Sequence, residues 1–131
     1  MYLLDTNICS ALMKENRQAA IQFNRAFPRC YTSTIVVAEL YKGILGSQQL
    51  QKNLQALEDL TRYLDIEPFD LLAAEEFGKI QVELKQIGKP TGEVDAFIAA
   101  VARSRQSILV TNNTRHFENI ANLTLEDWLE S

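Results

Sequence analysis

The feature that most constrains this fold is the direct junction between an apolar run and a polar group near the start of the sequence. The run is Tyr2-Leu3-Leu4, and Asp5-Thr6-Asn7 follow it with no linker between. Such an apolar run predicts a buried strand, and Asp, Thr and Asn are residues at which helices begin. Asp5 is therefore expected at the carboxyl end of a strand and the mouth of a helix, where ligands bind in open α/β sheets. Taken alone, a role as helix cap is the simpler interpretation of Asp5.

Strand and helix patterns alternate along the rest of the chain. Apolar residues at helical spacing predict helices over 6–14, 17–27, 35–45, 48–64, 70–87 and 94–105. Short apolar runs predict further strands over 29–32, 64–68, 107–110 and 123–125. This alternation favours an α/β fold with three layers, α/β/α, around a central and mainly parallel sheet. The sequence contains no repeat or linker pattern, so we expect a single domain over 1–131.

The acidic balance of the chain limits the functions that it suits. Lys and Arg number 13 against 17 Asp and Glu, which gives a net charge of −4 and a pI near 5.0. This excludes a general nucleic-acid coat, which would be basic, but not an enzyme that meets nucleic acid through a metal-charged cleft. The charge also suits a basic partner.

Membrane and export signals are absent from the sequence pattern. No run approaches the roughly 18 consecutive apolar residues of a membrane span, and no basic segment precedes an apolar one as in a secretory signal. Cys9 and Cys30 are too few for a disulfide scaffold and are expected as buried thiols. We therefore expect a cytoplasmic chain with no membrane association.

Three acidic side chains occupy unusual places in the predicted elements. Asp5 follows the first strand, Glu39 lies within an otherwise apolar helix, and Asp95 opens a helix behind the Gly-containing loop 89–93. On their own, these residues could be a cap, a solvent-facing position and a partner of the helix dipole. If their elements meet at one edge of a parallel sheet, the carboxylates converge, and repulsion raises their pKa values unless a divalent cation binds. Oxygen ligands alone select Mg²⁺ or Mn²⁺, and a water on Mg²⁺ can cleave a phosphodiester. Spacing by itself does not establish the convergence.

Four segments resemble the motifs of one family in their order and spacing. They are LLDTN with ICS (residues 3–10), AELYKG (38–43), DAFIAA (95–100) and LVTNN with TRHF (109–117). Together they resemble the PIN-domain nucleases, and among these the VapC-type toxins of bacterial toxin–antitoxin pairs. The four motifs cover nearly the whole chain, which makes the resemblance specific where LLDTN alone would be weak.

The resemblance implies a fold, an activity and a set of partners. The fold is an α/β/α sandwich around a parallel sheet. The activity is that of a metal-dependent endoribonuclease, which hydrolyses RNA phosphodiester bonds with a Mg²⁺-activated water, and Mn²⁺ can substitute. The partners are RNA, a cognate VapB-like antitoxin and a second copy in a homodimer. Asp5, Glu39 and Asp95 match the three acidic metal-site positions, with Asp5 and Asp95 as direct or water-mediated ligands and Glu39 orienting or deprotonating the attacking water.

Residues around the acids carry supporting roles under the same resemblance. Thr6 and Asn7 belong to the first motif, and the hydroxyl of Thr111 is expected to orient a water or a substrate oxygen. The family often carries Asp where this chain has Asn113, and an amide brings no charge, so we expect one well-occupied Mg²⁺ and a weak or absent second site. The DTNICS opening is similar to that of VapC members that cut initiator tRNA in the anticodon loop, which makes tRNA the expected substrate.

Basic side chains and one histidine flank the motifs. Lys42 and Arg115 are expected to contact RNA phosphates, and Lys89 lies in a comparable place. A solvated surface charge is the simpler interpretation of each, and phosphate contacts would make binding depend on salt. The lone His116 is expected in a loop or structural role, because a metal-bound water needs no imidazole base. The family also implies an antitoxin segment over the helices of 6–27 and 35–64, with a basic side chain among the acids.

Two other functions are compatible with the sequence. A phosphotransfer or phosphatase domain could use Asp5 as its nucleophile, although a haloacid-dehalogenase-like motif would need an acid where Asn7 stands. A non-catalytic PIN-like module could bind RNA or a protein, in which case the Asn at position 113 would reflect lost activity. RNA cleavage that needs Mg²⁺ or Mn²⁺ and stops with EDTA separates the nuclease from both.

Overall fold

Five short parallel strands form the centre of the fold. The computed structural model describes residues 1–129, so the last two residues of the expected domain lie outside the described range. The strands are β1 (Tyr2–Leu4), β2 (Cys30–Ser33), β3 (Asp65–Glu67), β4 (Ile108–Val110) and β5 (Thr124–Glu126). They lie in the order β3-β2-β1-β4-β5, and every neighbouring pair is parallel. The expected parallel sheet is confirmed.

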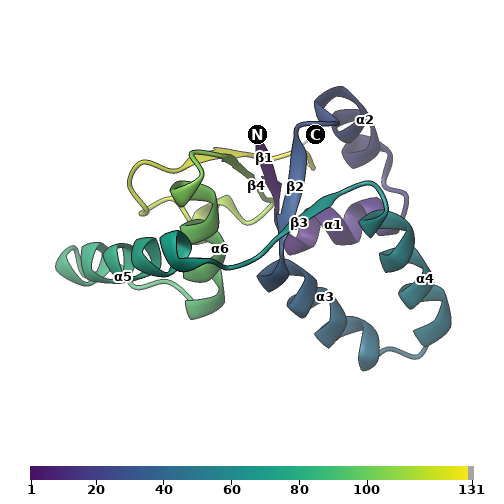
Figure 1. The fold of residues 1–131 in the computed structure, drawn as a ribbon, viewed down its shortest axis with the longest axis horizontal. Helices are drawn as coiled ribbons and strands as arrows, with labels where there is room; N and C mark the ends of the chain where they lie inside the picture. The colour runs from purple at the N-terminus through teal and green to yellow at the C-terminus, as the bar shows by residue number, and fades with distance from the viewer. Residues whose placement is uncertain (130–131) are drawn as a thin grey trace.

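Helices cover both faces of this sheet. Those along the first half of the chain are α1 (Thr6–Met13), α2 (Arg17–Ala26), α3 (Thr34–Leu45) and α4 (Leu50–Thr61). The second half carries α5 (Leu71–Gln86), α6 (Glu93–Ser104) and the 3₁₀ turn η1 (Thr114–His116). Figure 1 shows α5 and α6 on one side of the strands and α1 to α4 on the other. This is the expected three-layer α/β/α arrangement, and the helix expected over 48–64 is the one that differs most, since α4 is shorter at both ends.

Polar side chains set the starts of four helices. Each accepts a hydrogen bond from a backbone N–H of the first turn: Asp5 from Thr6 in α1, Asn16 from Ala19 in α2, Ser33 from Val36 in α3 and Asp70 from Ala73 in α5. Such caps stabilise a helix by about 1 kcal/mol each. The capping role expected for Asp5 is therefore confirmed, and it leaves the second carboxylate oxygen of Asp5 for other partners.

Apolar burial places α6 and the central strands in one core. The four alanines of α6 are fully buried: Ala96, Ala99, Ala100 and Ala102. Small side chains let a helix approach a sheet closely, and α6 contacts β4 and α5 directly. Leu3 and Leu4 of β1 are equally buried, as befits a parallel strand covered on both faces. The packing fixes the start of α6, and with it Asp95, relative to the sheet.

The strand order creates a crevice between β1 and β4. From β1 the chain moves to β2 and β3 on one side, and it then crosses back to β4 on the other side. In open α/β sheets such a reversal leaves a crevice at the carboxyl ends of the strands, where ligands bind. Asp5 follows β1 and Thr111 follows β4, so both lie at this crevice. Asp95 lies in the first turn of α6, and Glu39 lies midway along α3 and reaches the first turn of α1, so both acids approach the same edge of the sheet.

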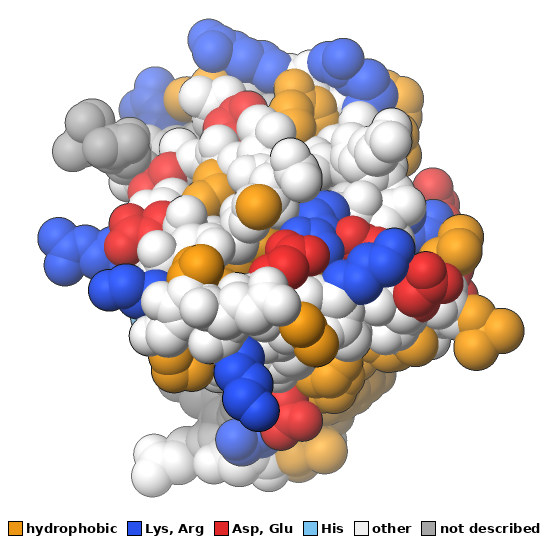
Figure 2. Space-filling model, turned by 90° about the vertical axis from the view of Figure 1, so that its left-hand side faces the viewer, with side chains coloured by type: hydrophobic (Ala, Val, Ile, Leu, Met, Phe, Trp, Pro, Cys, Tyr) orange, Lys and Arg blue, Asp and Glu red, His pale blue; other side chains and the backbone are white. Residues whose placement is uncertain are grey.

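Acidic and basic side chains interleave on the face that carries α5. Figure 2 shows this face, where red and blue side chains lie next to one another. Lys79 pairs with Glu75 at 3.2 Å, and Arg103 of α6 pairs with Glu83 at 2.8 Å. Ion-paired side chains attract a polyanion such as nucleic acid only weakly, because the neighbouring carboxylate offsets the field of each cation. This face is therefore a poor nucleic-acid binding surface. Among the helices of residues 1–129, none has the length and apolar character needed to cross a bilayer.

Candidate active site

Asp5 is held in one orientation at the crevice. Its side chain is almost fully buried, with the residue 3% exposed. One carboxylate oxygen accepts a hydrogen bond from the N–H of Thr6 at 2.7 Å, and the other accepts one from the hydroxyl of Thr111 at 2.8 Å. The side-chain amide of Asn7 approaches the second oxygen at 3.4 Å. Donors from two segments more than 100 residues apart in sequence therefore fix this carboxylate.

Burial and neighbouring acids raise the pKa of Asp5. Loss of hydration on burial is the largest cause, and the negative charges of Asp95 and Glu39 raise the pKa further. Hydrogen bonds from Thr111 and Thr6 lower it without cancelling the rise. The three carboxylates thus share an electrostatic environment in which ionised Asp5 is disfavoured.

Thr6 connects Glu39 to Asp5. Glu39 is half-buried in α3, and its Oε1 accepts a hydrogen bond from the hydroxyl of Thr6 at 2.6 Å. The same residue donates its backbone N–H to Asp5. A contact between α3 and the first turn of α1 therefore orients Glu39, which does not simply face solvent.

Asp95 is held by a histidine that sequence reasoning did not assign to the site. Asp95 lies in the first turn of α6 with its side chain 26% exposed, and its Oδ2 lies 3.0 Å from His116 Nδ1. The hydroxyl of Thr91 donates to the carbonyl of His116 at 2.9 Å, which ties the loop before α6 to η1. The acid and the histidine are 21 residues apart and share no periodic pattern, so no local signal in the sequence announces the contact.

The segment after β4 reaches both Asp5 and Asp95. Its first residue, Thr111, donates to Asp5, and the N–H of Asn113 donates to the Thr111 hydroxyl at 3.1 Å. The N–H of Asn112 donates to the Asn7 side chain at 2.9 Å. Asn113 thus contributes its backbone here while its side chain is exposed. The roles expected for Thr111 toward a water and for Asn113 toward a metal stay predictions.

The acids reach one edge of the sheet without forming a closed ligand set. Within residues 1–129, no three Asp, Glu, His or Cys side chains come close enough together to hold a metal ion as they stand. Glu39 is engaged by Thr6, and Asp95 is engaged by His116. The three acids nevertheless offer carboxylate oxygens, and the charges of Asp95 and Glu39 disfavour ionised Asp5, so the set suits a hard cation that keeps several of its own waters.

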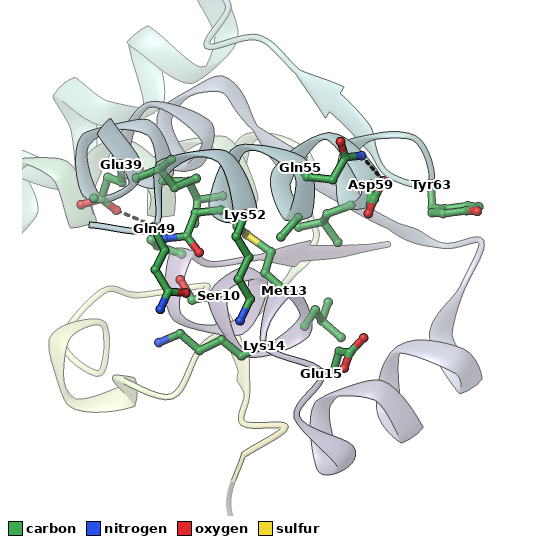
Figure 3. Close-up of a pocket in the computed structure, with 18 residues that line it drawn as sticks. Ser10, Met13, Lys14, Glu15, Glu39, Gln49, Lys52, Gln55, Asp59 and Tyr63 are labelled. Carbon is green, nitrogen blue, oxygen red and sulfur yellow. Dashed lines mark hydrogen bonds between the residues drawn. The ribbon is translucent and has the colours of Figure 1, made fainter. Parts of the chain in front are cut away.

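A large groove opens beside Glu39. It encloses about 950 Å³ and is lined by residues of α1, α3, α4 and the segments next to them. Glu39 lies at one end and Tyr63 at the other, with Met13 between them (Figure 3). Leu12, Met13, Leu40 and Ile44 supply much of its apolar lining. The groove agrees with the one expected between the early helices, except that no residue of α2 lines it.

A smaller pocket opens beside Asp95, and we call it the Asp95 pocket. It encloses about 380 Å³ between the loop before α6, the end of α5 and η1. Its lining comprises Leu84, Lys89, Pro90, Thr91, Gly92, Asp95, Arg115, His116, Asn119 and Ile120. Arg115, one of the two expected RNA contacts, is therefore beside the site. Lys42, the other, is exposed in the last turn of α3 and lines neither pocket.

Comparison with known proteins places these features in context. The PIN domain family matches residues 2–123. The tRNA(fMet)-specific endonuclease VapC of Shigella flexneri is 40% identical over 129 residues, which cover 97% of each chain. Ribonuclease VapC2 of Haemophilus influenzae is also 40% identical, over 98% of each chain. Among solved structures, VapBC2 from Rickettsia felis bound to a DNA fragment from its promoter superposes with a TM-score of 0.92 at 32% identity, covering 97% of this chain and 98% of that one.

Proposed function

The chain belongs to the PIN-domain family and, within it, to the VapC ribonucleases, and from this premise we propose that the edge holding Asp5, Glu39 and Asp95 cleaves RNA. The observation that carries the proposal is the state of Asp5. It is a buried carboxylate that donors from two segments hold in place, and its pKa is raised by burial first and by two further acids second. A purely structural cap has no need of such surroundings, whereas a carboxyl whose pKa is shifted by burial and by nearby charges, in a crevice, is typical of functional sites.

Each acid has a distinct role in this reaction. Asp5 and Asp95 would hold Mg²⁺ or Mn²⁺, directly or through water, and Glu39 orients the attacking water and accepts its proton. When bound, the cation supplies charge stabilisation for the phosphate and lowers the pKa of water. Thr111 and Thr6 fix the orientation of the Asp5 carboxylate, and His116 fixes one oxygen of Asp95.

The substrate class follows from the relatives. The Shigella flexneri protein is named for its action on tRNA(fMet), and we propose a tRNA as the substrate of this chain as well. The reaction takes place in the cytoplasm, where tRNA is found and where the thiols of Cys9 and Cys30 remain free.

A protein partner of the VapB type fits the groove beside Glu39. An apolar floor with charged rims is the surface that an amphipathic helix recognises. A basic side chain at the end of such a helix would meet Glu39, which lies at the end of the groove (Figure 3). The Rickettsia felis structure is of VapBC2, which supports a partner of this kind. The homodimer expected from the family stays a prediction, which analytical ultracentrifugation checks.

Purified protein on purified tRNA tests the function. With Mg²⁺ the wild type should produce discrete fragments, and EDTA should stop the cleavage. Asp5→Asn should remove it, while the matched control Asp65→Asn, an exposed acid in β3, should keep it. Cleavage by the Asp5 variant at the wild-type rate would refute the catalytic assignment. RNA binding without cleavage, at any metal concentration, would instead indicate a non-catalytic module.

A further inference from the structure

The Asp95 pocket differs in charge from the rest of this acidic chain. Lys89 and Arg115 line it against one carboxylate, that of Asp95. The chain as a whole has a net charge of −4. A local excess of cations next to a proposed phosphodiester-cleaving site favours an anionic group at that place.

The pocket also carries groups that suit a base. Its apolar lining comprises the exposed Pro90 and the nearly fully buried Leu84 and Ile120, and Asn119 adds an amide that can donate and accept. The imidazole of His116 also lines it, with more than half of its side chain exposed and one nitrogen at Asp95. Unpaired RNA bases stack on imidazole and apolar surface and use amides for their edges. A volume of about 380 Å³ is near the lower end of the range for ligand pockets, roughly 300 Å³.

The walls of the pocket are joined before any ligand binds. The hydroxyl of Thr91 on one wall donates to the carbonyl of His116 on the other, and the His116 ring contacts Asp95. A joined pocket loses little conformational freedom on binding, which favours affinity for a small group. The groove beside Glu39 is also crossed by a hydrogen bond, from Thr6 to Glu39, but its charge differs, because acids and bases are mixed along its length (Figure 3).

We propose that the Asp95 pocket binds one unpaired nucleotide of the RNA next to the scissile phosphate, with Lys89 and Arg115 at its phosphate group. This inference rests on the proposed RNA cleavage. It implies that the RNA strand leaves the three acids on the side of Asp95. Lys89 and Arg115 act by binding, so their loss weakens substrate affinity and leaves the chemical step intact.

The double variant Lys89→Ala/Arg115→Ala tests the proposal against the matched control Lys85→Ala. Lys85 is also exposed, in the last turn of α5, and lines neither pocket. The double variant should raise the KM for tRNA cleavage about tenfold with kcat retained. With each variant carried on Asp5→Asn, binding of a fluorescent single-stranded RNA of mixed sequence should lose about 0.7 from its salt slope, since both side chains are placed at one phosphate and each single-strand phosphate contributes about 0.7. The control should change neither quantity.

Each result bears on one of the two proposals. A wild-type KM and an unchanged salt slope in the double variant would overturn the nucleotide site while cleavage by the wild type upheld the nuclease. Equal losses in the Lys85 control would also overturn it, because the effect would then be one of general charge. If the wild type did not cut RNA, the proposed nuclease function would be refuted. The comparison of RNA binding would still test whether the Asp95 pocket binds a nucleotide.

A crosslinking experiment provides a second, independent readout. The same RNA containing 4-thiouridine is irradiated with the chain carrying Asp5→Asn, and the adducts are located by peptide mass spectrometry. Adducts on the peptides covering 89–92 and 115–120 are expected. Adducts confined to α1, α3 and α4 would overturn the proposal, since they would put the strand in the groove.

Discussion

The two hollows beside the acidic edge differ in almost every property that governs recognition. The groove beside Glu39 is large and has an apolar floor, and its sides carry acids and bases together. The Asp95 pocket has less than half that volume, and its cations exceed its acids. One carboxylate of the site belongs to each hollow, and the buried Asp5 belongs to neither lining.

Under the two proposals, this difference separates the place that binds a protein from the place that binds RNA. Extended apolar surface suits a partner helix, whereas a small cationic pocket suits one nucleotide and its phosphate. Asp5 lies at the crevice between β1 and β4 and couples electrostatically to an acid on each side. A partner proposed for the groove would therefore inhibit by reaching Glu39 without having to fill the Asp95 pocket.

The largest expected effect tests whether the two sides work as one catalytic unit. Glu39→Gln and Asp95→Asn should each lower kcat for RNA cleavage by roughly 10² to 10³-fold, as removal of a group that stabilises transition-state charge does. The double variant should be little worse than either single one, because groups that act together are not additive. Single-turnover cleavage measures this. Multiplying effects would mean that the hollows act independently.

A bulky side chain placed in the groove tests whether the groove binds the protein partner and not RNA. Gly43 lines the groove, Gly78 of α5 lines neither hollow, and a Cβ at either meets nothing within 4 Å. Gly43→Trp should lower the affinity for the purified VapB-type partner about 30-fold, which corresponds to about 2 kcal/mol of binding free energy at a central interface position. Gly78→Trp should leave this affinity unchanged. Isothermal titration calorimetry measures the affinity, and RNA cleavage by both should match the wild type. Loss of cleavage in Gly43→Trp would place RNA in the groove as well.

The contact of His116 with Asp95 predicts a smaller effect on the pocket side. His116→Ala should lower kcat about fivefold, since an exposed hydrogen bond to a charged group contributes about 1 kcal/mol. His116→Asn, whose amide can reach Asp95 in place of Nδ1, should recover most of the rate. A steady-state comparison of the two variants checks this. Equal rates for the Ala and Asn variants would show that His116 does not position Asp95.

The smallest expected effect concerns stability without metal. The pKa of Asp5 is raised in the folded chain, so the folded chain keeps this proton to a higher pH than the unfolded chain. Stability therefore falls as pH rises above the ordinary value of 3.8, and ionised Asp5 destabilises the fold at neutral pH. Asp5→Asn should raise the Tm at pH 7 in EDTA, and the gain should vanish below pH 3.8. Calorimetry from pH 3 to pH 7 measures this. A lower Tm for Asp5→Asn than for the wild type at pH 7 would show that ionised Asp5 does not destabilise the fold.

Much of the fold follows from local patterns in the sequence. Asp70 marks the start of a helix, and the apolar run predicted as a strand over 107–110 contains β4, because these signals depend on neighbours in the chain. The end of α4 was less predictable, since helical spacing continues beyond Thr61 while the chain turns toward β3. The position of Asp5 at the carboxyl end of a strand followed from the apolar run 2–4 and the helix-start residues directly after it.

The detailed contacts of the site do not follow from local patterns. Thr6 with Glu39, Thr111 with Asp5 and His116 with Asp95 join residues 21 to 106 positions apart. Such pairs depend on how the helix and sheet layers pack together. No short stretch of the sequence shows which distant residues this packing will bring into contact. The motifs pointed to the three acids, but they did not show that Thr6, Thr111 and His116 engage them. Because these contacts hold the acids apart, the carboxylates lie at one edge of the sheet without forming a cluster of metal ligands within residues 1–129.

The most direct test of the acidic edge is sequencing of RNA ends in cells after induced expression. Wild type and Asp5→Asn are compared at equal protein levels, with the Asp65→Asn chain as control. The account predicts new ends at a few discrete positions in tRNA for the wild type and the control, and none for the Asp5 variant. The same new ends in all three samples would contradict it, because cleavage would then not depend on the carboxylate at the crevice.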